Sequence, residues 1–551
     1  MADFSHILAQ MGDFGPFQKK LVLLCSIPLI PFSFALAGSV FLSMTPDHWC
    51  AFPEAKRLLN ECGWTQAHVM EYTIPRSGES FCHCERFEMN LSRWTCDDVY
   101  QHLVSKEAQV APCNGEWEFN SSHSTIVSEF SLVCNMSWKA GLNHIMLRSG
   151  LLFSGFITGH MSDRFGRKPC FIGFMFFLGI AGVGVMLSPW YPLLLLFRFL
   201  QGFFERGAWT SGYVLLVEFV GPNYRKFVAL MTSLFYDMGM VALPGLAYFI
   251  SSWRTLQLIL TLPWFLFIPY YWMVPESPRW LLAQRRNSEA MKIVAKVAKC
   301  NGRTLSQNLE EVTHLEKRST AHPLSLLVLV KTPVLRQNTL ILIYIWFSAG
   351  FVFHGLILHQ VEAEKNLYLE FLVPSAMRFP VGFIIYMMVD RVGRRHFLAG
   401  TCLIGGIYCF AAPFIFTEHT WGKNAMKTII NMALSALLKT LFFANAELYP
   451  TNLRNLGLTV CSSSFDVAIM AAPFLHHWLT DIWPELPFCI YGVITVVNCG
   501  LVTLLPETKG VVLPDTVDEM EDLRRKENQS TEESFSMACV GGVARSQHPS
   551  V

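Results

Sequence analysis

The chain has 551 residues, of which 52% are apolar and 15% are charged, and its formal net charge is +1. Soluble proteins carry roughly 25% charged residues, so this composition excludes an ordinary soluble enzyme. The lack of a basic excess gives no support to a nucleic-acid partner. The apolar content is enough for about twelve membrane spans of about 20 residues each, and we therefore expect an all-α membrane protein.

Apolar runs long enough to cross a bilayer recur in two groups of six. The first group is expected at 21–43, 145–162, 170–188, 191–217, 227–250 and 256–274. The second group is expected at 338–358, 367–389, 397–416, 426–446, 455–478 and 485–505. The first run is too long for the apolar part of a secretory signal, so we interpret it as a retained helix. The predicted domains are a terminal segment 1–20, the first helix 21–43, a large loop 44–144, helices two to six in 145–274, a loop 275–337, helices seven to twelve in 338–505, and a tail 506–551.

The charges of the loops predict how the chain crosses the membrane. The large loop 44–144 holds seven Lys and Arg residues, whereas segment 281–336 holds ten. Two short loops, DRFGRK (163–168) and DRVGRR (390–395), are also basic. Because cytoplasmic loops are enriched in Lys and Arg, we expect loop 44–144 outside the cell and both termini in the cytoplasm. Segment 281–336 is expected to form short cytoplasmic helices, and the polar end of the tail is expected to be disordered.

The large loop also has the composition of a secreted domain. Seven of the 16 cysteines lie in it, and it contains glycosylation sequons at Asn90, Asn120 and Asn135. This pattern predicts a disulfide framework with one cysteine left over and a glycosylated loop. The sequence does not give the disulfide pairing. We expect no metal site and no cofactor, and disulfide chemistry explains the Cys82-His83-Cys84 cluster better than zinc does.

Three motifs occur twice at nearly one interval. DRFGRK (163–168) is echoed by DRVGRR (390–395), Glu218 before Arg225 by Glu447 before Arg454, and Pro275-Glu-Ser by Pro506-Glu-Thr, each about 230 residues later. Such a repeat indicates two six-helix halves with a binding site between them near the middle of the membrane.

The same motifs resemble those of a known family. The loop GxxxDRxGRK (159–168) and RFLQG (198–202) resemble signatures of the major facilitator superfamily. TPDH (45–48), PESPRW (275–280), NAELYP (445–450) and LPETKG (505–510) are similar to the family of organic cation, organic anion and carnitine transporters. HSTIVSEF (123–130), ILH (357–359) and VCSS (460–463) resemble its organic cation branch, of the extraneuronal monoamine type.

The resemblance implies the major facilitator fold, with twelve transmembrane helices in two halves. It implies a multi-pass plasma-membrane transporter that moves varied organic cations by facilitated, potential-driven alternating access. That branch has six cysteines in its large loop, which makes Cys82 the extra one here.

Ionisable residues inside spans are costly and are therefore candidate functional residues. Asp466 lies midway along the eleventh span, where the resemblance implies an acid in cation carriers and an arginine in anion and carnitine carriers. We expect Asp466 to anchor a substrate ammonium, with simple pairing to a neighbouring base as the alternative. Aromatic rings can hold the rest of a cation, and packing is the alternative for each: Trp209, Tyr213, Phe235, Tyr236, Trp346 and Phe353.

Several other ionisable residues depart from the cation pattern. Arg378, Lys439 and Arg148 add bases to the eighth, tenth and second spans, and Asp237 adds an acid to the fifth. Asp237 could pair with Lys439 or with Arg378, or the bases could hold the carboxylate of a zwitterion. The sequence leaves these alternatives open. His354 and His359 in the seventh span are candidate proton-sensitive positions, and a hydrogen-bonded helix histidine is the simpler interpretation.

Repeated charges at the cytoplasmic ends of the helices predict a gate. We expect ion pairs there to form and break during alternating access, and they come from Asp163, Arg167, Glu218, Arg225, Asp390 and Arg394. By resemblance, Glu447 lies near the substrate path, and pairing with Arg454 or with a helix end is its alternative role.

Other functions remain as rivals. One is a carnitine-like zwitterion or organic anion carrier, and another is a transporter-like receptor that moves nothing. An enzyme is disfavoured because no HExxH, Walker loop or GxSxG motif occurs. The expected partners are small organic cations and membrane lipid, with no nucleic acid, and the sequence leaves oligomerisation open.

Overall fold

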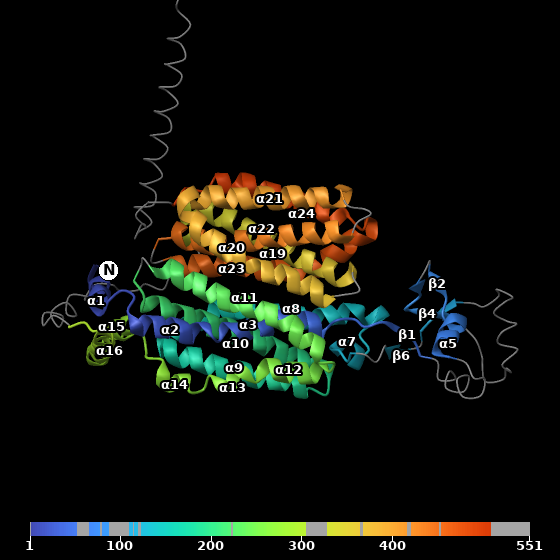
Figure 1. Ribbon diagram of the computed structural model, residues 1–551, viewed down its shortest axis with the longest axis horizontal. Helices are drawn as coiled ribbons and strands as arrows, with labels where there is room; N and C mark the ends of the chain where they lie inside the picture. Colours follow the sequence, from blue (N-terminus) through green and yellow to red (C-terminus); the bar gives the residue numbers. More distant parts are fainter. Residues whose placement is uncertain are drawn as a thin grey trace, which may run out of the picture.

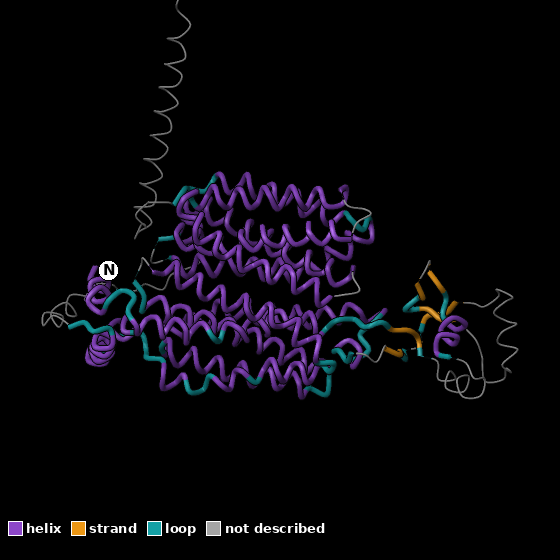
Figure 2. Tube along the Cα trace, viewed as in Figure 1, coloured by secondary structure: helices purple, strands orange, loops and turns teal. Residues whose placement is uncertain are grey.

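A computed structural model describes residues 2–51, 65–77, 80–87, 110–113, 115–119, 123–221, 224–304, 328–363, 367–415, 420–450 and 453–508. Helices dominate the described residues, and short strands occur only in the large loop (Figure 2). The helices form one bundle of two halves (Figure 1). The first half contains α2 (Pro16–Ser26), α3 (Leu29–Leu42), α8 (Ser137–Phe165), α9 (Arg167–Leu187), α10 (Tyr191–Glu218), α11 (Arg225–Phe249), α12 (Trp253–Thr261), α13 (Pro263–Leu266) and α14 (Tyr270–Met273). The second half contains α19 (Pro333–Ala363), α20 (Leu367–Val392), α21 (Arg394–Ile415), α22 (Thr420–Leu448), α23 (Arg454–Ile482) and α24 (Leu486–Thr503).

The described residues account for the twelve expected spans. Ten stretches are long and apolar enough to cross a membrane. The long helices α8 and α10 run beside them and complete the twelve, although polar side chains lower their hydropathy. These include Arg148 in α8 and Arg198, Glu205 and Arg206 in α10.

Proline breaks two of the spans. The first span is α2 followed by α3, with Pro28 between them, and the sixth is α12 to α14, interrupted at Pro263 and Pro269. Proline lacks the N–H that would continue the ladder of helical hydrogen bonds. Both spans still run the full expected length, as Pro16–Leu42 and Trp253–Met273.

The two halves meet along two pairs of helices, α8 against α23 and α11 against α20. We call the end from which residues 44–144 leave the bundle the large-loop end, and the end that carries loops 163–168 and 390–395 the signature-loop end. At the large-loop end, the Phe41 ring of α3 lies 5.9 Å from the Tyr368 ring and 5.1 Å from the Phe371 ring of α20. Each half has an apolar core of its own.

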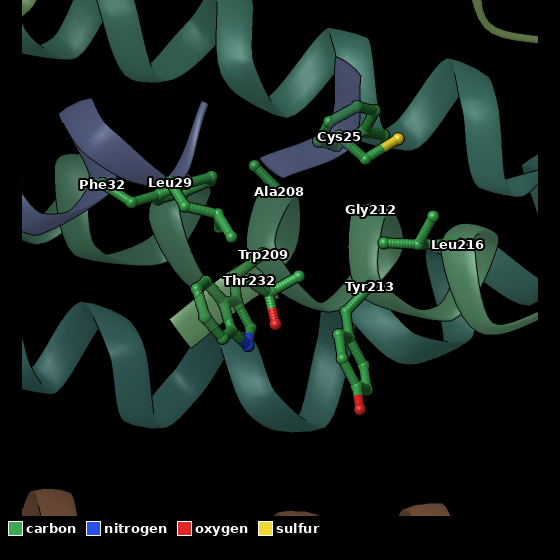
Figure 3. Close-up of a pocket in the computed structure, with 10 residues that line it drawn as sticks. Cys25, Leu29, Phe32, Ala208, Trp209, Gly212, Tyr213, Leu216 and Thr232 are labelled. Atoms are coloured by element: carbon green, nitrogen blue, oxygen red, sulfur yellow. The ribbon is translucent and has the colours of Figure 1, made fainter. Parts of the chain in front are cut away.

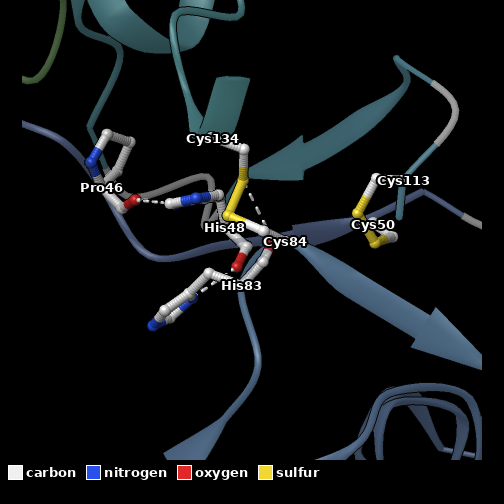
Figure 4. Close-up of a disulfide and its surroundings, with 7 residues drawn as sticks. All are labelled: Pro46, His48, Cys50, His83, Cys84, Cys113 and Cys134. Carbon is white, nitrogen blue, oxygen red and sulfur yellow. Dashed lines mark hydrogen bonds between the residues drawn. A yellow bond between two sulfur atoms is a disulfide. The ribbon is translucent and has the colours of Figure 1, made fainter. Parts of the chain in front are cut away.

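Small sheets and disulfides order the described part of the large loop. The three antiparallel pairs are β1 (His48–Cys50) with β6 (Trp117–Phe119), β2 (Arg76–Ser77) with β3 (Ser80–Phe81), and β4 (Glu85–Phe87) with β5 (Val110–Pro112), and one helix, α5, covers Gln66–Thr73. The disulfides are Cys50–Cys113 and Cys84–Cys134 (Figure 4). Cys82 is free, as the resemblance to the organic cation branch implied. Cys62, Cys96, Asn90 and Asn120 lie outside the described residues, whereas Asn135 is exposed in the turn η2 (Cys134–Met136) before α8.

Hydrogen bonds fix the last part of this loop to the first half of the bundle. Ser124 N donates to Ser251 O at 2.8 Å, and Trp253 N donates to Ser124 O at 3.2 Å. In the short helix α7 (Ile126–Glu129), Glu129 accepts from Trp253 Nε1 at 2.7 Å and pairs with Arg254. Towards the second half, the His123 ring lies 6.2 Å from the Tyr368 ring. The loop is therefore anchored on α12.

Short helices gather at the signature-loop end, as expected for part of 281–336. They are α1 (Ala2–Met11), α15 (Pro278–Ala283), α16 (Asn287–Cys300) and α18 (Val328–Lys331). Asn301 joins this group to the N-terminus, because its side chain donates to Met11 O at 2.8 Å and accepts from Phe17 N at 3.1 Å.

Candidate functional site

Asp466 lies at the interface between the halves and is 2% exposed. It belongs to α23, and both of its ion-pair partners belong to the other half. Arg148 of α8 lies 3.4 Å from one carboxylate oxygen, and Arg206 of α10 lies 3.3 Å from the other. Arg206 also donates to Ser462 Oγ at 2.6 Å. Two guanidinium groups therefore neutralise the carboxylate in this conformation.

Arg206 and its neighbour Glu205 also lie at this candidate site, although the sequence analysis did not single them out. Glu205 is 5% exposed, and Arg148, Arg198 and Asp466 all act on its charge. Both lie within the predicted span 191–217, so the cost of burying ionisable groups in a membrane was the signal that could have found them.

A second ion pair crosses the interface between the halves. Lys439 Nζ of α22 lies 2.6 Å from Asp237 Oδ2 of α11, and Asp237 is 1% exposed. This is one of the pairings that the sequence left open. It gives Lys439 a counter-charge inside the protein.

Removing one member of this pair is expected to destabilise the protein. Lys439→Met would leave the Asp237 carboxylate buried without its partner, which typically costs about 3–5 kcal/mol. The double variant Asp237→Leu with Lys439→Met is expected to recover most of the loss, because replacing both charges by apolar groups is often neutral. Thermal unfolding of the purified protein would measure this. A single variant as stable as the wild type would show that the pair has no structural role.

Arg378 occupies a cation position over an aromatic ring. Its Cζ lies 5.8 Å from the ring centre of Phe353, and its Nε is buried without a hydrogen bond in the described part of the chain. Phe353 in turn lies 6.1 Å from Phe465, and Trp346 contacts Phe465 and Phe442 edge-on at 6.0 and 4.8 Å. The predicted residues Trp346 and Phe353 thus belong to one aromatic cluster of the second half.

The predicted aromatic residues of the first half pack against the core of that half, and Tyr236 among them also lies near the central charges of Arg148, Glu205 and Asp237. The Trp209 ring lies 6.0 Å from Phe32 and 6.3 Å from Tyr236. Trp209 and Tyr213 line a small pocket within this half, together with Leu29 and Phe32 of α3 (Figure 3). Phe235 packs against the same apolar core. The structure therefore does not bring Trp209 and Tyr213 into contact with Asp466.

The repeated charges at the signature-loop end form the same arrangement in each half. In the first half, Arg167 pairs with Asp163 at 2.5 Å and lies 3.6 Å from Glu218. In the second half, Arg394 pairs with Asp390 at 3.0 Å and with Glu447 at 3.1 Å. Glu447 therefore lies with the signature-loop charges and pairs with Arg394, whereas the sequence placed it near the substrate path or with Arg454. Arg225 lies near Arg279 and Tyr213.

The third repeated motif explains why these loops hold their shape. Glu276 accepts hydrogen bonds from the N–H groups of Arg167 and Lys168 at 3.1 and 3.2 Å, and Glu507 accepts from those of Arg394 and Arg395 at 3.0 and 3.1 Å. A carboxylate at a helix N-terminus satisfies free N–H groups and complements the helix dipole. Burial nevertheless raises the pKa of Glu276 above its ordinary value.

The residue before α9 and the residue before α21 must each be glycine. Gly166 has φ +109° and Gly393 has φ +99°, in the region that side chains disfavour. A Cβ atom would also lie 2.5 Å from Glu276 Oε2 or 2.7 Å from Glu507 Oε2. The glycine in each signature loop therefore lets the carboxylate approach the backbone.

Lys226 was not singled out from the sequence, yet it joins the two halves at the signature-loop end. It lies in the first turn of α11 and forms an ion pair with Asp390 near the end of α20. Its Nζ also lies 4.5 Å from the ring centre of Tyr386. Asp390 thus bridges Lys226 of one half and Arg394 of the other.

Comparison with known proteins agrees with this architecture. Residues 98–519 match the model of the family "Sugar (and other) transporter". The chain is 39% identical over 534 residues to rat solute carrier family 22 member 2, covering 95% of this chain and 96% of the relative. It is 38% identical over 527 residues to the human member 2, covering 94% and 95%, and 39% identical over 529 residues to bovine member 1, covering 96% and 94%.

Solved structures give the same fold. The major facilitator superfamily proton:xylose symporter XylE matches with a TM-score of 0.60 at 16% identity, covering 92% of this chain and 99% of that one. Its inward-open form from E. coli also matches with a TM-score of 0.60, at 15% identity and with the same coverage. The matches are to transporters and not to enzymes. With its two six-helix halves, the chain therefore belongs to the sugar (and other) transporter family and, within it, to solute carrier family 22.

Proposed function

We propose that this protein carries varied organic cations across the plasma membrane by alternating access. The observation that supports this most is the buried carboxylate of Asp466, which holds cationic groups at the interface between the halves. A carboxylate removed from water attracts an ammonium group far more strongly than it would in bulk solvent. The membrane potential would drive uptake, since moving one charge through 100 mV is worth about 2.3 kcal/mol.

In this proposal, the substrate replaces guanidinium groups of the protein. Arg148 and Arg206 form ion pairs with Asp466, and the guanidinium group of Arg378 lies over the ring of Phe353. An incoming ammonium group would take one of these positions, and the displaced arginine would be free to move with its own half. Aromatic faces bind cations with little directional demand, which suits substrates of varied shape.

The proposed topology follows the loop charges. Loop 44–144 would be extracellular, disulfide-linked and glycosylated, and both termini would be cytoplasmic. The ion pairs at the signature-loop end would then form the cytoplasmic gate.

The test is an uptake panel in cells that express the full chain at clamped membrane potential. The probes are a quaternary ammonium compound, a monoamine, carnitine and an aromatic carboxylate. We expect uptake of the first two, with roughly tenfold accumulation for each 60 mV of potential. Uptake of the aromatic carboxylate without either cation would refute the proposal.

The excess of bases favours a second candidate, a carrier of zwitterions. Arg378 has a buried Nε atom without a hydrogen bond in the described part of the chain, and a substrate carboxylate would satisfy it while Asp466 held the amine. Carnitine uptake that Arg378→Gln abolishes, with the quaternary ammonium unaffected, would favour this candidate.

A further inference from the structure

Two histidine rings form a contact between the halves near the large-loop end. His144 lies two turns into α8 in the first half, and His354 lies in α19 in the second half. Their rings are stacked, with centres 4.5 Å apart and planes 12° from parallel. His354 is 4% exposed. The contact can therefore exist only while the halves are together at this end.

The hydrogen bonds of His144 define its proton position. Its Nδ1 lies 3.1 Å from Ser39 Oγ of α3, and Ser39 Oγ donates its own proton to Leu36 O at 3.1 Å. Ser39 must therefore accept, and His144 donates from Nδ1. The lone pair of a neutral ring is then on Nε2, which is buried and has no hydrogen-bond partner in the described residues. Nε2 of His144 therefore has a free lone pair, and a ring nitrogen needs a free lone pair to bind a proton.

The charged and titratable groups that act on the two rings are all basic within the described chain. Arg148 of α8 acts on both, Arg198 of α10 acts on His144, and His476 of α23 acts on His354. The element α3 contributes only the hydroxyl of Ser39. Arg148 is itself paired with Asp466. A proton on either ring would therefore meet like charges, and a second proton would meet the first across the stack.

We propose that His144 and His354 form a proton-binding site that opens the large-loop end of the transporter. Neutral rings stack and keep the halves together, whereas protonated rings repel each other and Arg148, so the separated arrangement binds protons better. By linkage, acid on that side shifts the population towards the open form. The inference rests on alternating access, which is part of the proposed function, but not on the identity of the substrate.

The test measures the opening directly and without a substrate. The purified full chain in lipid nanodiscs would carry spin labels, introduced as non-canonical amino acids, at the exposed positions Trp138 and Asp481 of α8 and α23. Distance distributions would be recorded at about pH 7.5 and about pH 5.5, on either side of the ordinary histidine pKa of about 6.5. One strictly coupled proton changes the ratio of open to closed forms by up to about tenfold for each pH unit.

We expect the ratio to rise at least about fivefold in acid for the wild type and to stay constant for the double variant His144→Gln with His354→Gln. Each single variant keeps one ring and is expected to show a smaller change, so the proposal stays testable if the double variant does not fold. His477→Gln is the matched control, because His477 is an exposed histidine on α23, and its response should equal that of the wild type.

A wild-type ratio that does not change with pH, or a double variant that responds like the wild type, would overturn the proposal. The uptake panel separates this result from the proposed function. Opening in acid without any cation uptake would keep the proton site and reject the cation carrier. Cation uptake with no opening in acid would reject the proton site and keep the cation carrier.

Discussion

Asp466→Asn is expected to reduce uptake of a quaternary ammonium compound by about ten- to a hundredfold. A hydrogen-bonded contact with a charged group is worth roughly 1.5–3 kcal/mol. The variant removes the carboxylate to which the substrate ammonium would bind in place of an arginine. It also leaves Arg148 and Arg206, which lie 3.4 and 3.3 Å from that carboxylate, without their counter-charge. Initial uptake rates, divided by the amount of protein at the cell surface, would measure the effect.

The matched control for this prediction is Asp481→Asn. Asp481 lies on the same helix but is exposed near the large-loop end, so its charge is screened by solvent and its loss should leave uptake unchanged. If Asp466→Asn transported the quaternary ammonium at the wild-type rate, Asp466 would have only the pairing role that the sequence offered as its alternative.

Reversing the charge of Lys226 is expected to reduce turnover by about tenfold. Lys226→Asp would replace the ion pair with Asp390 by a repulsion between the two halves, and coupling energies of this kind are typically about 1–3 kcal/mol. The signature-loop end would then open too readily. The swapped variant, Lys226→Asp with Asp390→Lys, would restore the attraction between the halves but would lose the ion pair of Asp390 with Arg394, so it is expected to recover part of the turnover. The maximal rate of uptake would measure both.

The control for the swap is Arg286→Gln. Arg286 pairs with Glu289 on the surface of α16, where both side chains are about half exposed, and such pairs contribute little. Its turnover should match the wild type. If Lys226→Asp kept the wild-type turnover, the ion pair between Lys226 and Asp390 would not control the gate.

Much of the charge arrangement at the signature-loop end could be predicted from the sequence because it repeats. Asp163 with Arg167 and Asp390 with Arg394 are only four residues apart, on either side of the glycine in each signature loop, so each pair was expected to lie close together. Glu218 was placed with these charges, whereas Glu447 was expected near the substrate path or beside Arg454, and the partner of neither was predicted. They pair with Arg167 and Arg394 on other helices, and such contacts depend on how helices pack, which a repeat does not specify.

The centre of the protein was harder to predict for the same reason. Asp466 was singled out from the sequence because a carboxylate within an apolar span is conspicuous. The sequence left open the partner of Asp237, because every base in a span was a candidate. Trp209 and Tyr213 were expected at the central site, yet they line a pocket inside the first half. Which face of a long apolar helix turns towards the other half depends on small rotations, and an aromatic residue suits either face.

The attachment of the large loop has a consequence for how the molecule moves. Ser124 and Glu129 bind the loop to α12, and the Cys84–Cys134 disulfide ties the chain that leads into α8 to β4. All of these anchors belong to the first half. If the halves rock against each other, the loop should move as a rigid extension of the first half. A molecule that binds only this loop would move with the first half, whereas one that also contacts α20 beside Tyr368 would hold the two halves in a fixed arrangement.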